Sequence, residues 1–266
     1  MAPADFDLLA IPVPFRMQPG LQRLEGGRHL TALAECSALW QEKRQALARG
    51  DSRLAVPGFD ERPVVEAILQ RARSEGLPAG EPIELAFEQD FALLDGRDTT
   101  LPWLCVNVPS HWAPEEKLGL PFQAVHAPVA DNQLLQAAAR QLVQLVTSGG
   151  EWERSVWTVT PSGRYDQHPR RHARTPWPDT ADPGAFAAQC WLRAERQTFF
   201  PLAPGSRQAV FTIRVMLQPL ADAVATPAHA QRLQAALGTM TDAVLAYKGL
   251  APARERLLAW LAARAA

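Results

Sequence analysis

The chain has 266 residues, of which 47% are hydrophobic and 21% are charged, and its formal net charge is −1. This composition is typical of a globular protein with an apolar core, and the balanced charge argues against the basic surface of a nucleic-acid-binding domain. The three cysteines lie far apart and show no C-x-x-C spacing, so neither a zinc knuckle nor a covalent c-type haem site is encoded.

The cysteines and the apolar runs also predict where the protein resides. Each cysteine is flanked by apolar or small residues, and we expect Cys36, Cys105 and Cys190 to be buried, unreactive thiols. Residues 1–14 contain aspartates and no basic residue, unlike the start of a secretory signal. No apolar run has the length of a membrane span. We therefore expect a cytoplasmic protein with no membrane partner and no nucleic-acid partner.

The N-terminal part is predicted to be extended and then helical. Residues 1–28 contain several prolines, which forbid a regular helix. Residues 29–49 place leucines and alanines on roughly one helical face, and Gly50 follows them. Residues 60–76 predict a second helix, with a proline in the first turn and a glycine at the end.

A β-hairpin is predicted next, followed by an irregular segment and a helix. Residues 83–94 begin with alternating apolar and polar side chains, a turn sequence follows, and residues 101–108 form a second apolar strand. Residues 109–129 are rich in proline, aromatic and charged side chains, which is typical of a loop that shapes a site. Residues 132–147 carry an apolar stripe with helical spacing.

The C-terminal half predicts three strands, a long loop and terminal helices. Residues 154–160, 191–200 and 208–217 have the composition of strands. Residues 161–185 form a polar loop rich in proline, arginine and histidine, and loops of this length are often functional. Residues 226–261 carry helical stripes that begin after a Thr-Pro cap.

This order of elements predicts an α+β fold. A hairpin, helices in the middle and a three-stranded antiparallel meander match the plan of a PAS-like domain, in which helices pack on one face of the sheet and leave a pocket. We divide the chain into an N-terminal extended and helical segment (1–82), a PAS-like core (83–217) and C-terminal helices (218–266). Helical extensions at both termini would complete one compact unit.

His126 is the central candidate for a functional residue. It lies in the sequence VHAPV at 125–129, after an apolar run and before a proline. A lone histidine in such a setting is either a satisfied structural residue or a ligand, because a neutral imidazole in an apolar pocket is what haem iron requires. Its position between the hairpin and the meander would direct the ring toward the sheet.

Strand alternation sorts the charged residues of the strand at 191–200. Glu195 and Gln197 fall on one face and Arg196 on the other, beside apolar neighbours. An arginine on an apolar face needs an anion, either a structural carboxylate or a ligand carboxylate such as a haem propionate. Arg214, on the next strand, presents the same choice.

The remaining candidates are weaker. His168 and His172 lie in the long loop among arginines, where the alternatives are a solvated basic loop and a lid or partner-docking surface. The sequence contains no G-x-S-x-G elbow, Walker A loop, G-x-G-x-x-G or H-E-x-x-H motif.

Several sequence blocks, taken together, carry a family resemblance. They are PFRM at 14–17 with the nearby Gly-Leu, EQD at 88–90, the segments 109–119 and 125–129, the strand sequences 192–198 and 211–214, and YKG at 247–249. In this order and spacing the blocks resemble the alpha subunit of haem-dependent oxidative N-demethylases over nearly the whole chain. The chain departs from the family pattern at Ala130 and Val156, where we would expect proline and asparagine.

The resemblance implies a PAS-like fold that binds haem b through a histidine axial ligand. It implies a haem monooxygenase, an oxidoreductase that uses O2 to remove a methyl group from a small secondary amine such as dimethylamine and releases formaldehyde. In this family the electrons come from NADPH through a separate flavin and iron–sulfur subunit. The chain itself has no nucleotide motif and too few cysteines for a cluster, so it would need such a reductase partner; an oligomer is left open.

The resemblance also implies roles for particular residues. His126 would be the axial ligand of the iron. Arg196 and Arg214 would contact the haem propionates, and Trp112 and Lys117 would shape the rim. Glu195, Gln197 and Tyr165 are the candidates to face the substrate, since a small amine cation favours a carboxylate or an aromatic ring. The alternatives are a PAS-like haem-binding sensor or interaction module without turnover, and a relative that binds no haem.

Overall fold

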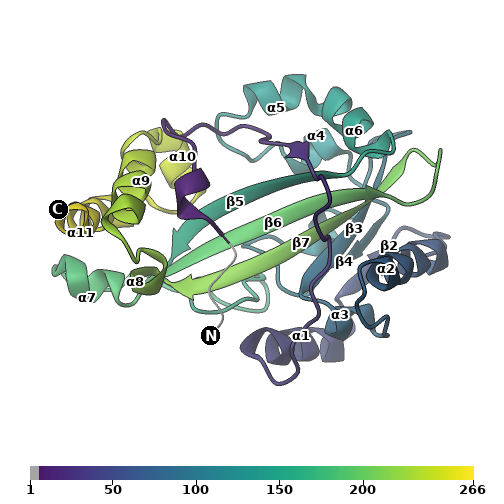
Figure 1. Cartoon of the computed structure of the whole chain (residues 1–266), viewed down its shortest axis with the longest axis horizontal. Helices are drawn as coiled ribbons and strands as arrows, with labels where there is room; N and C mark the ends of the chain where they lie inside the picture. The colour runs from purple at the N-terminus through teal and green to yellow at the C-terminus, as the bar shows by residue number, and fades with distance from the viewer. Residues whose placement is uncertain (1–5) are drawn as a thin grey trace.

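The computed structural model describes residues 6–266 and shows an α+β protein built on one antiparallel sheet. The sheet has seven strands in the order β1-β5-β6-β7-β3-β4-β2 (Figure 1). This confirms the predicted α+β class. Of the segment predicted to be extended, residues 1–5 lie outside the described residues, and the rest is largely irregular. In Figure 1 it passes in front of the long strands, from the C-terminal helices to α1.

The strands lie close to their predicted positions. The hairpin and the meander are both present, and neighbouring strands pair antiparallel throughout. The short strands β1 and β2 extend the sheet at its two edges. The bounds are β1 Gln22–Arg23, β2 Arg53–Ala55, β3 Gln89–Asp95, β4 Trp103–Cys105, β5 Trp152–Thr160, β6 Trp191–Pro201 and β7 Gln208–Pro219.

The helices of the middle of the chain cover one face of the sheet. We call it the α4 face; it carries Glu195 and Gln197 of β6. Val143 and Val146 of α6 pack there against Phe199, and Phe122 packs against the same cluster. The continuous helix predicted over 132–147 is divided at Ala138. The elements of this layer are η2 Pro114–Glu116, α4 Phe122–Val125, α5 Gln133–Ala137 and α6 Ala139–Thr147.

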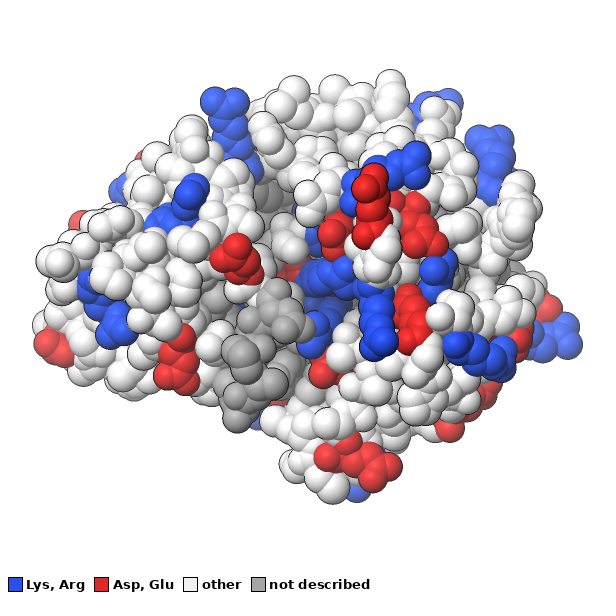
Figure 2. Space-filling view, in the orientation of Figure 1, with Lys and Arg blue, Asp and Glu red and all other residues white. Residues whose placement is uncertain are grey.

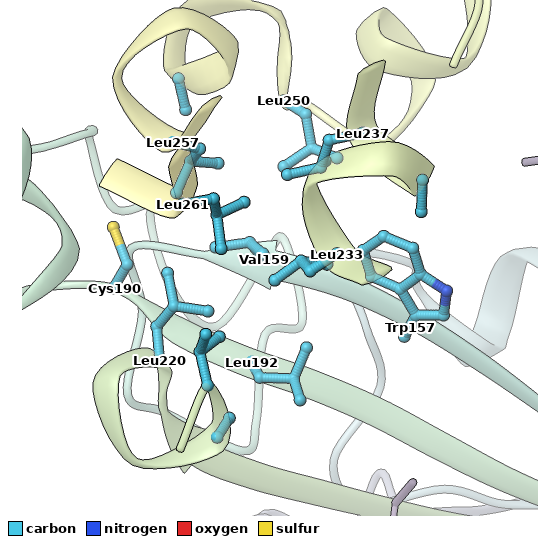
Figure 3. Packing of buried hydrophobic residues seen from close by; sticks show 14 of the residues in the cluster. Trp157, Val159, Cys190, Leu192, Leu220, Leu233, Leu237, Leu250, Leu257 and Leu261 are labelled. Atoms are coloured by element: carbon cyan, nitrogen blue, oxygen red, sulfur yellow. The ribbon is translucent and has the colours of Figure 1, made fainter. Parts of the chain in front are cut away.

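Helices from the two ends of the chain cover the opposite face, which we call the α2 face; it carries Arg196 and Thr198. Ile68 of α2 (Arg62–Ser74) packs at one end of this face, in a cluster with Phe200. At the other end α9 (Pro227–Gly238) and α11 (Arg254–Ala265) pack on β5 and β6. Figure 3 shows leucines of these two helices meeting Trp157, Val159 and Leu192 of the strands.

Shorter elements connect these layers. They are η1 Leu8–Ala10, α1 Ala38–Arg49, α3 Ile83–Ala86, α7 Pro183–Ala187, α8 Leu220–Ala223, α10 Asp242–Tyr247 and η3 Ala251–Ala253. Among the helices of residues 6–266, none combines the length and the apolar character that crossing a bilayer requires.

The first predicted helix begins later than expected. We predicted helix from residue 29, but α1 begins at Ala38, where the Ser37 side chain caps the backbone N–H of Trp40. The preceding residues bond elsewhere: the backbone N–H groups of His29 and Leu30 donate to the Glu75 carboxylate at 2.9 and 3.0 Å. Further along, the backbone N–H of Leu33 donates to the Ala86 carbonyl at 3.0 Å and the Thr31 carbonyl accepts from Glu88 at 2.9 Å. These groups are therefore not available for the i→i+4 bonds of a helix.

Two further local predictions were wrong. Residues 83–86 form the helix α3 rather than the start of a strand, and the Glu84 carboxylate is buried there because Arg53 donates to it at 2.7 Å. Cys36 is exposed, on a backbone turn with φ of 61°. Cys105 and Cys190 are buried as predicted, and burial raises the pKa of Cys190 to about 12, which keeps its thiol protonated.

The C-terminal helices depend on apolar burial against the sheet. Leu233 of α9 is 0% exposed, and we expect Leu233→Ala to lower the free energy of unfolding by about 2–4 kcal/mol, through lost burial and the cavity left behind. The matched control is Leu134→Ala on α5, where the side chain is 66% exposed and the change should stay within about 0.5 kcal/mol. Urea denaturation measures both. Equal losses would contradict this account of the packing.

Candidate functional site

His126 follows α4 on the α4 face, and its ring has one free nitrogen. Its Nδ1 lies 2.8 Å from the backbone carbonyl oxygen of Phe122, one helical turn earlier. A carbonyl only accepts, so Nδ1 carries the hydrogen and Nε2 keeps its lone pair. No hydrogen bond to Nε2 occurs among residues 6–266. This is the tautomer that a metal ligand needs.

The backbone around His126 is fixed by neighbouring side chains. The Asn132 amide donates to the carbonyl oxygens of His126 and Ala127, both at 3.0 Å. The Lys117 ammonium donates to the carbonyl of Val125 at 3.3 Å. The His126 ring also lies against Phe122, with ring centroids 4.1 Å apart. The imidazole is therefore held in place before any ligand binds.

Partial burial keeps this imidazole neutral. It lowers the pKa of His126 to about 4, and the positive charges of Arg154 and Lys117 act in the same direction. The unfolded chain, with an ordinary histidine pKa near 6.5, therefore binds more protons than the folded chain between these values. The stability contributed by the partly buried neutral ring is complete above pH 6.5 and is lost as the pH falls toward 4.

We expect this titration to be measurable without haem. Between about pH 7 and pH 4, the apo protein should lose more free energy of unfolding than its His126→Gln variant, whose side chain stays neutral throughout. Urea denaturation at a series of pH values gives the comparison. Parallel pH profiles for the two proteins would show that His126 is not buried in its neutral form.

The sheet brings polar residues to the same face as His126. The register pairs Arg154 with Gln197 and Val156 with Glu195, so side chains of β5 and β6 lie side by side. Phe122 packs in the cluster that contains Phe199, which has the same strand parity as Glu195 and Gln197. The α4 segment therefore faces these two residues across the layer.

Glu195 lies at the centre of a hydrogen-bond network. The Ser110 hydroxyl donates to one carboxylate oxygen, and the Gln197 amide donates to the other at 2.7 Å. Arg193 Nε in turn donates to the Ser110 oxygen at 2.8 Å. The structure thus brings together Glu195 and Gln197, both predicted to face the substrate, and adds Ser110 and Arg193, to which sequence reasoning gave no role.

Arg154 is a third site residue that the sequence did not reveal. Its Nε atom is buried and has no hydrogen-bond acceptor among residues 6–266. Burial lowers the pKa of Arg154, and the charge of Glu195 acts against this effect. A guanidinium stays charged in proteins. Arg154 is therefore a buried cation that could bind an anionic group on the His126 face.

Aromatic side chains line the same layer. Trp112 and Tyr165 pack against the cluster that contains Ile213 and Val215 of β7, whose register partners are Gln197 and Glu195. Trp112 comes from the loop after β4 and Tyr165 from the long loop. Both predicted residues therefore lie on the α4 face, as does Lys117 through its bond to the α4 backbone.

Arg196 and Arg214 lie on the α2 face, with the sheet between them and His126. The Glu153 carboxylate accepts from Arg196 at 2.7 Å, and the Glu88 carboxylate accepts from Arg214 at 2.5 Å. The sequence is compatible with two partners for these arginines, a structural carboxylate or a haem propionate, and the structure shows structural carboxylates. A haem on His126 cannot reach both arginines through the sheet, so the predicted propionate contacts do not fit this placement.

A cavity of about 380 Å³ adjoins these two arginines on the α2 face and includes Arg28 and Leu77 in its lining. Figure 2 shows this side of the molecule, where basic and acidic side chains intermingle near the middle. His126 is not among the residues that line the cavity. The positive charges of Arg196 and Arg214 on the cavity wall are largely compensated by their ion pairs.

The long loop at 161–185 is held in place rather than freely solvated. His168 Nε2 lies 3.1 Å from the Glu115 carboxylate of η2, and His172 Nε2 lies 3.2 Å from the Asp166 carboxylate. Further along, the Trp177 indole donates to the carbonyl of Gly249 at 3.0 Å. The loop therefore covers the segment 109–117 and joins it to the C-terminal helices.

The residues present fit a haem better than a bare metal ion. Among residues 6–266, no three His, Cys, Asp or Glu side chains converge as a metal-binding group. Haem iron needs only one protein ligand, with apolar walls for the ring and cations for the propionates. His126, the aromatic side chains and Arg154 supply these three features on one face.

The comparison with known proteins agrees with this chemistry. Residues 74–258 match the model of a family described as "Haem-dependent oxidative N-demethylase, alpha subunit-like". The matched range covers most of the chain and contains every residue of the α4-face site.

Proposed function

The chain belongs to the family of haem-dependent oxidative N-demethylase alpha subunit-like proteins, and we propose that it binds haem b on the α4 face with His126 as the axial ligand. The observation that carries this proposal is the state of the His126 ring: Nδ1 is bonded to a carbonyl, Nε2 has no hydrogen-bond partner in the part of the chain that the structure describes, and partial burial keeps the ring neutral. A neutral, oriented imidazole is the form that coordinates iron.

The propionates would meet Arg154 rather than Arg196 and Arg214. Arg154 lies on the sheet face that carries His126, and its Nε has no hydrogen-bond acceptor within the described part of the chain, whereas the other two arginines are paired on the α2 face. A propionate would form the charge-assisted bond that Arg154 lacks. Trp112 would form an apolar wall, and Lys117 would hold the α4 backbone at the rim.

Glu195, Gln197 and Tyr165 would bind a small secondary amine in its ammonium form. The Glu195 carboxylate supplies the negative charge, and the half-buried Tyr165 ring supplies an aromatic surface. Gln197 holds one carboxylate oxygen, which fixes the direction from which the ammonium N–H groups approach. Apolar β7 residues beside Glu195 would accommodate the methyl groups and exclude water.

The proposed reaction is an O2-dependent N-demethylation. A secondary methylamine, O2, two electrons and two protons give the primary amine, formaldehyde and water: one oxygen atom enters formaldehyde and the other enters water. Bound haem would supply the oxygen activation. The electrons would come from NADPH through a separate reductase that carries flavin and an iron–sulfur cluster.

The test combines a spectrum with a product assay. We expect the protein expressed with a haem precursor to show a Soret band, and to convert dimethylamine to methylamine and formaldehyde in equal amounts when supplied with O2 and a reductant. A haem-loaded protein that consumes neither O2 nor amine would instead be a PAS-like sensing or interaction module. A protein that stays colourless would overturn the haem proposal.

A further inference from the structure

We infer that Ser110 and Arg193 are positioning residues that aim the Glu195 carboxylate at a cationic substrate. The inference rests on the proposed function of Glu195 and adds how the chain holds that carboxylate. It starts from a continuous donor chain: Arg193 Nε donates to Ser110 Oγ at 2.8 Å, and the Ser110 hydroxyl donates to Glu195.

The direction of this chain is fixed by chemistry. A guanidinium has only donors, so the Ser110 oxygen must accept from Arg193. The hydroxyl has a single hydrogen, and with its oxygen facing Arg193 that hydrogen is directed to Glu195. The Ser110 hydroxyl therefore cannot rotate to donate elsewhere, as the hydroxyl of a solvated serine could, and its hydrogen bond to the carboxylate is maintained.

Arg193 is itself anchored. Its side chain is buried, with 2% of the residue exposed, and no carboxylate of residues 6–266 pairs with it directly. Its remaining N–H groups donate to backbone carbonyls: Nη2 reaches Tyr165 at 2.9 Å and Val108 at 3.2 Å, and Nη1 reaches Arg164 at 3.2 Å. One guanidinium thus ties the Ser110 segment and the Tyr165 loop to β6.

The network leaves the carboxylate free to bind a cation. Ser110 and Gln197 each use one lone-pair position on a different oxygen of Glu195, and a carboxylate offers about four. The remaining positions can accept the two N–H groups of a secondary ammonium. Because the carboxylate is already oriented, binding would require little reorganisation.

The experiment measures dimethylammonium binding to the haem-loaded protein by isothermal titration calorimetry. We expect Ser110→Ala to raise the Kd roughly tenfold, since a hydrogen bond to a charged group is lost, and Ser110→Thr to restore most of the affinity. The affinity of the ferrous haem for carbon monoxide, a neutral ligand, should not change. The matched control is Ser155→Ala, an exposed serine of β5 on the α2 face, with wild-type affinity.

A double variant separates positioning from a general structural effect. In the Glu195→Gln background, Ser110→Ala should weaken binding no further, because both changes act through the same carboxylate. An equal loss in both backgrounds, or wild-type affinity for Ser110→Ala alone, would overturn the inference while leaving the role of Glu195 intact. Wild-type affinity for Glu195→Gln would overturn that role and the inference together. Haem content and thermal unfolding of each variant show that the fold is retained.

Discussion

His126→Ala is expected to leave a folded protein that no longer holds haem. The substitution removes the only side-chain nitrogen that we assign to the iron, and we expect haem affinity to fall roughly 100-fold or more, beyond what the loss of an outer-shell partner causes. The purified variant should lack the Soret band. Its circular dichroism should match that of the wild type, because the ring's one described hydrogen bond runs to its own helical turn.

The matched control is His111→Ala, since His111 is an exposed histidine on the loop that carries Ser110. This variant should keep its haem content and its spectrum. A second test replaces His126 by glycine and adds free imidazole, which should restore the Soret band by occupying the vacated position. A His126→Ala protein with full haem content and an unchanged spectrum would show that another residue binds the iron.

The strands were predictable because their signal is local. Apolar and β-branched residues in short runs placed β5, β6 and β7 within a few residues of their observed bounds. The start of α1 was not predictable, because residues 31–33 bond to another part of the chain: Leu33 donates to the Ala86 carbonyl, and the Thr31 carbonyl accepts from Glu88. The hydrophobic periodicity of a short stretch of sequence carries no information about partners from distant parts of the chain.

The candidate site divides in the same way. Strand alternation correctly placed Glu195 and Gln197 on one face and Arg196 on the other. What alternation could not supply was the relation of these faces to His126, which α4 determines, and the partner of Arg196, which is Glu153 on the neighbouring strand. The family resemblance implies that Arg196 contacts a haem propionate, whereas in the structure Arg196 donates to the Glu153 carboxylate.

Arg154 shows a further limit of sequence reasoning. Its position in β5 gives it the parity of the α4 face, a signal that was present in the sequence. Its importance, however, lies in its buried Nε, for which residues 6–266 provide no acceptor, and only the packed structure reveals this. The same holds for Ser110, whose hydroxyl meets Glu195 from a loop 85 positions away in the chain.

Glu195→Gln is expected to separate haem binding from amine turnover. The substitution keeps the size of the side chain and removes its charge, so haem content and the Soret band should stay at wild-type levels. The kcat/KM for dimethylamine should fall roughly 100-fold, which corresponds to the 1.5–3 kcal/mol of a hydrogen bond to a charged group. Formaldehyde release at several amine concentrations measures this fall.

The discriminating measurement compares a cation with a neutral molecule of the same shape. Dimethyl ether has the two methyl groups of dimethylammonium but no charge and no N–H donor, so its binding should not depend on the charge at position 195. The matched control is Glu153→Gln, which removes a carboxylate from the same sheet on the α2 face, where it pairs with Arg196. If Glu195→Gln weakens ether and amine equally, the carboxylate shapes the pocket without recognising the cation. If Glu153→Gln lowers turnover as much as Glu195→Gln, the substrate lies on the wrong face for the site described, because only one of these carboxylates shares a face with His126.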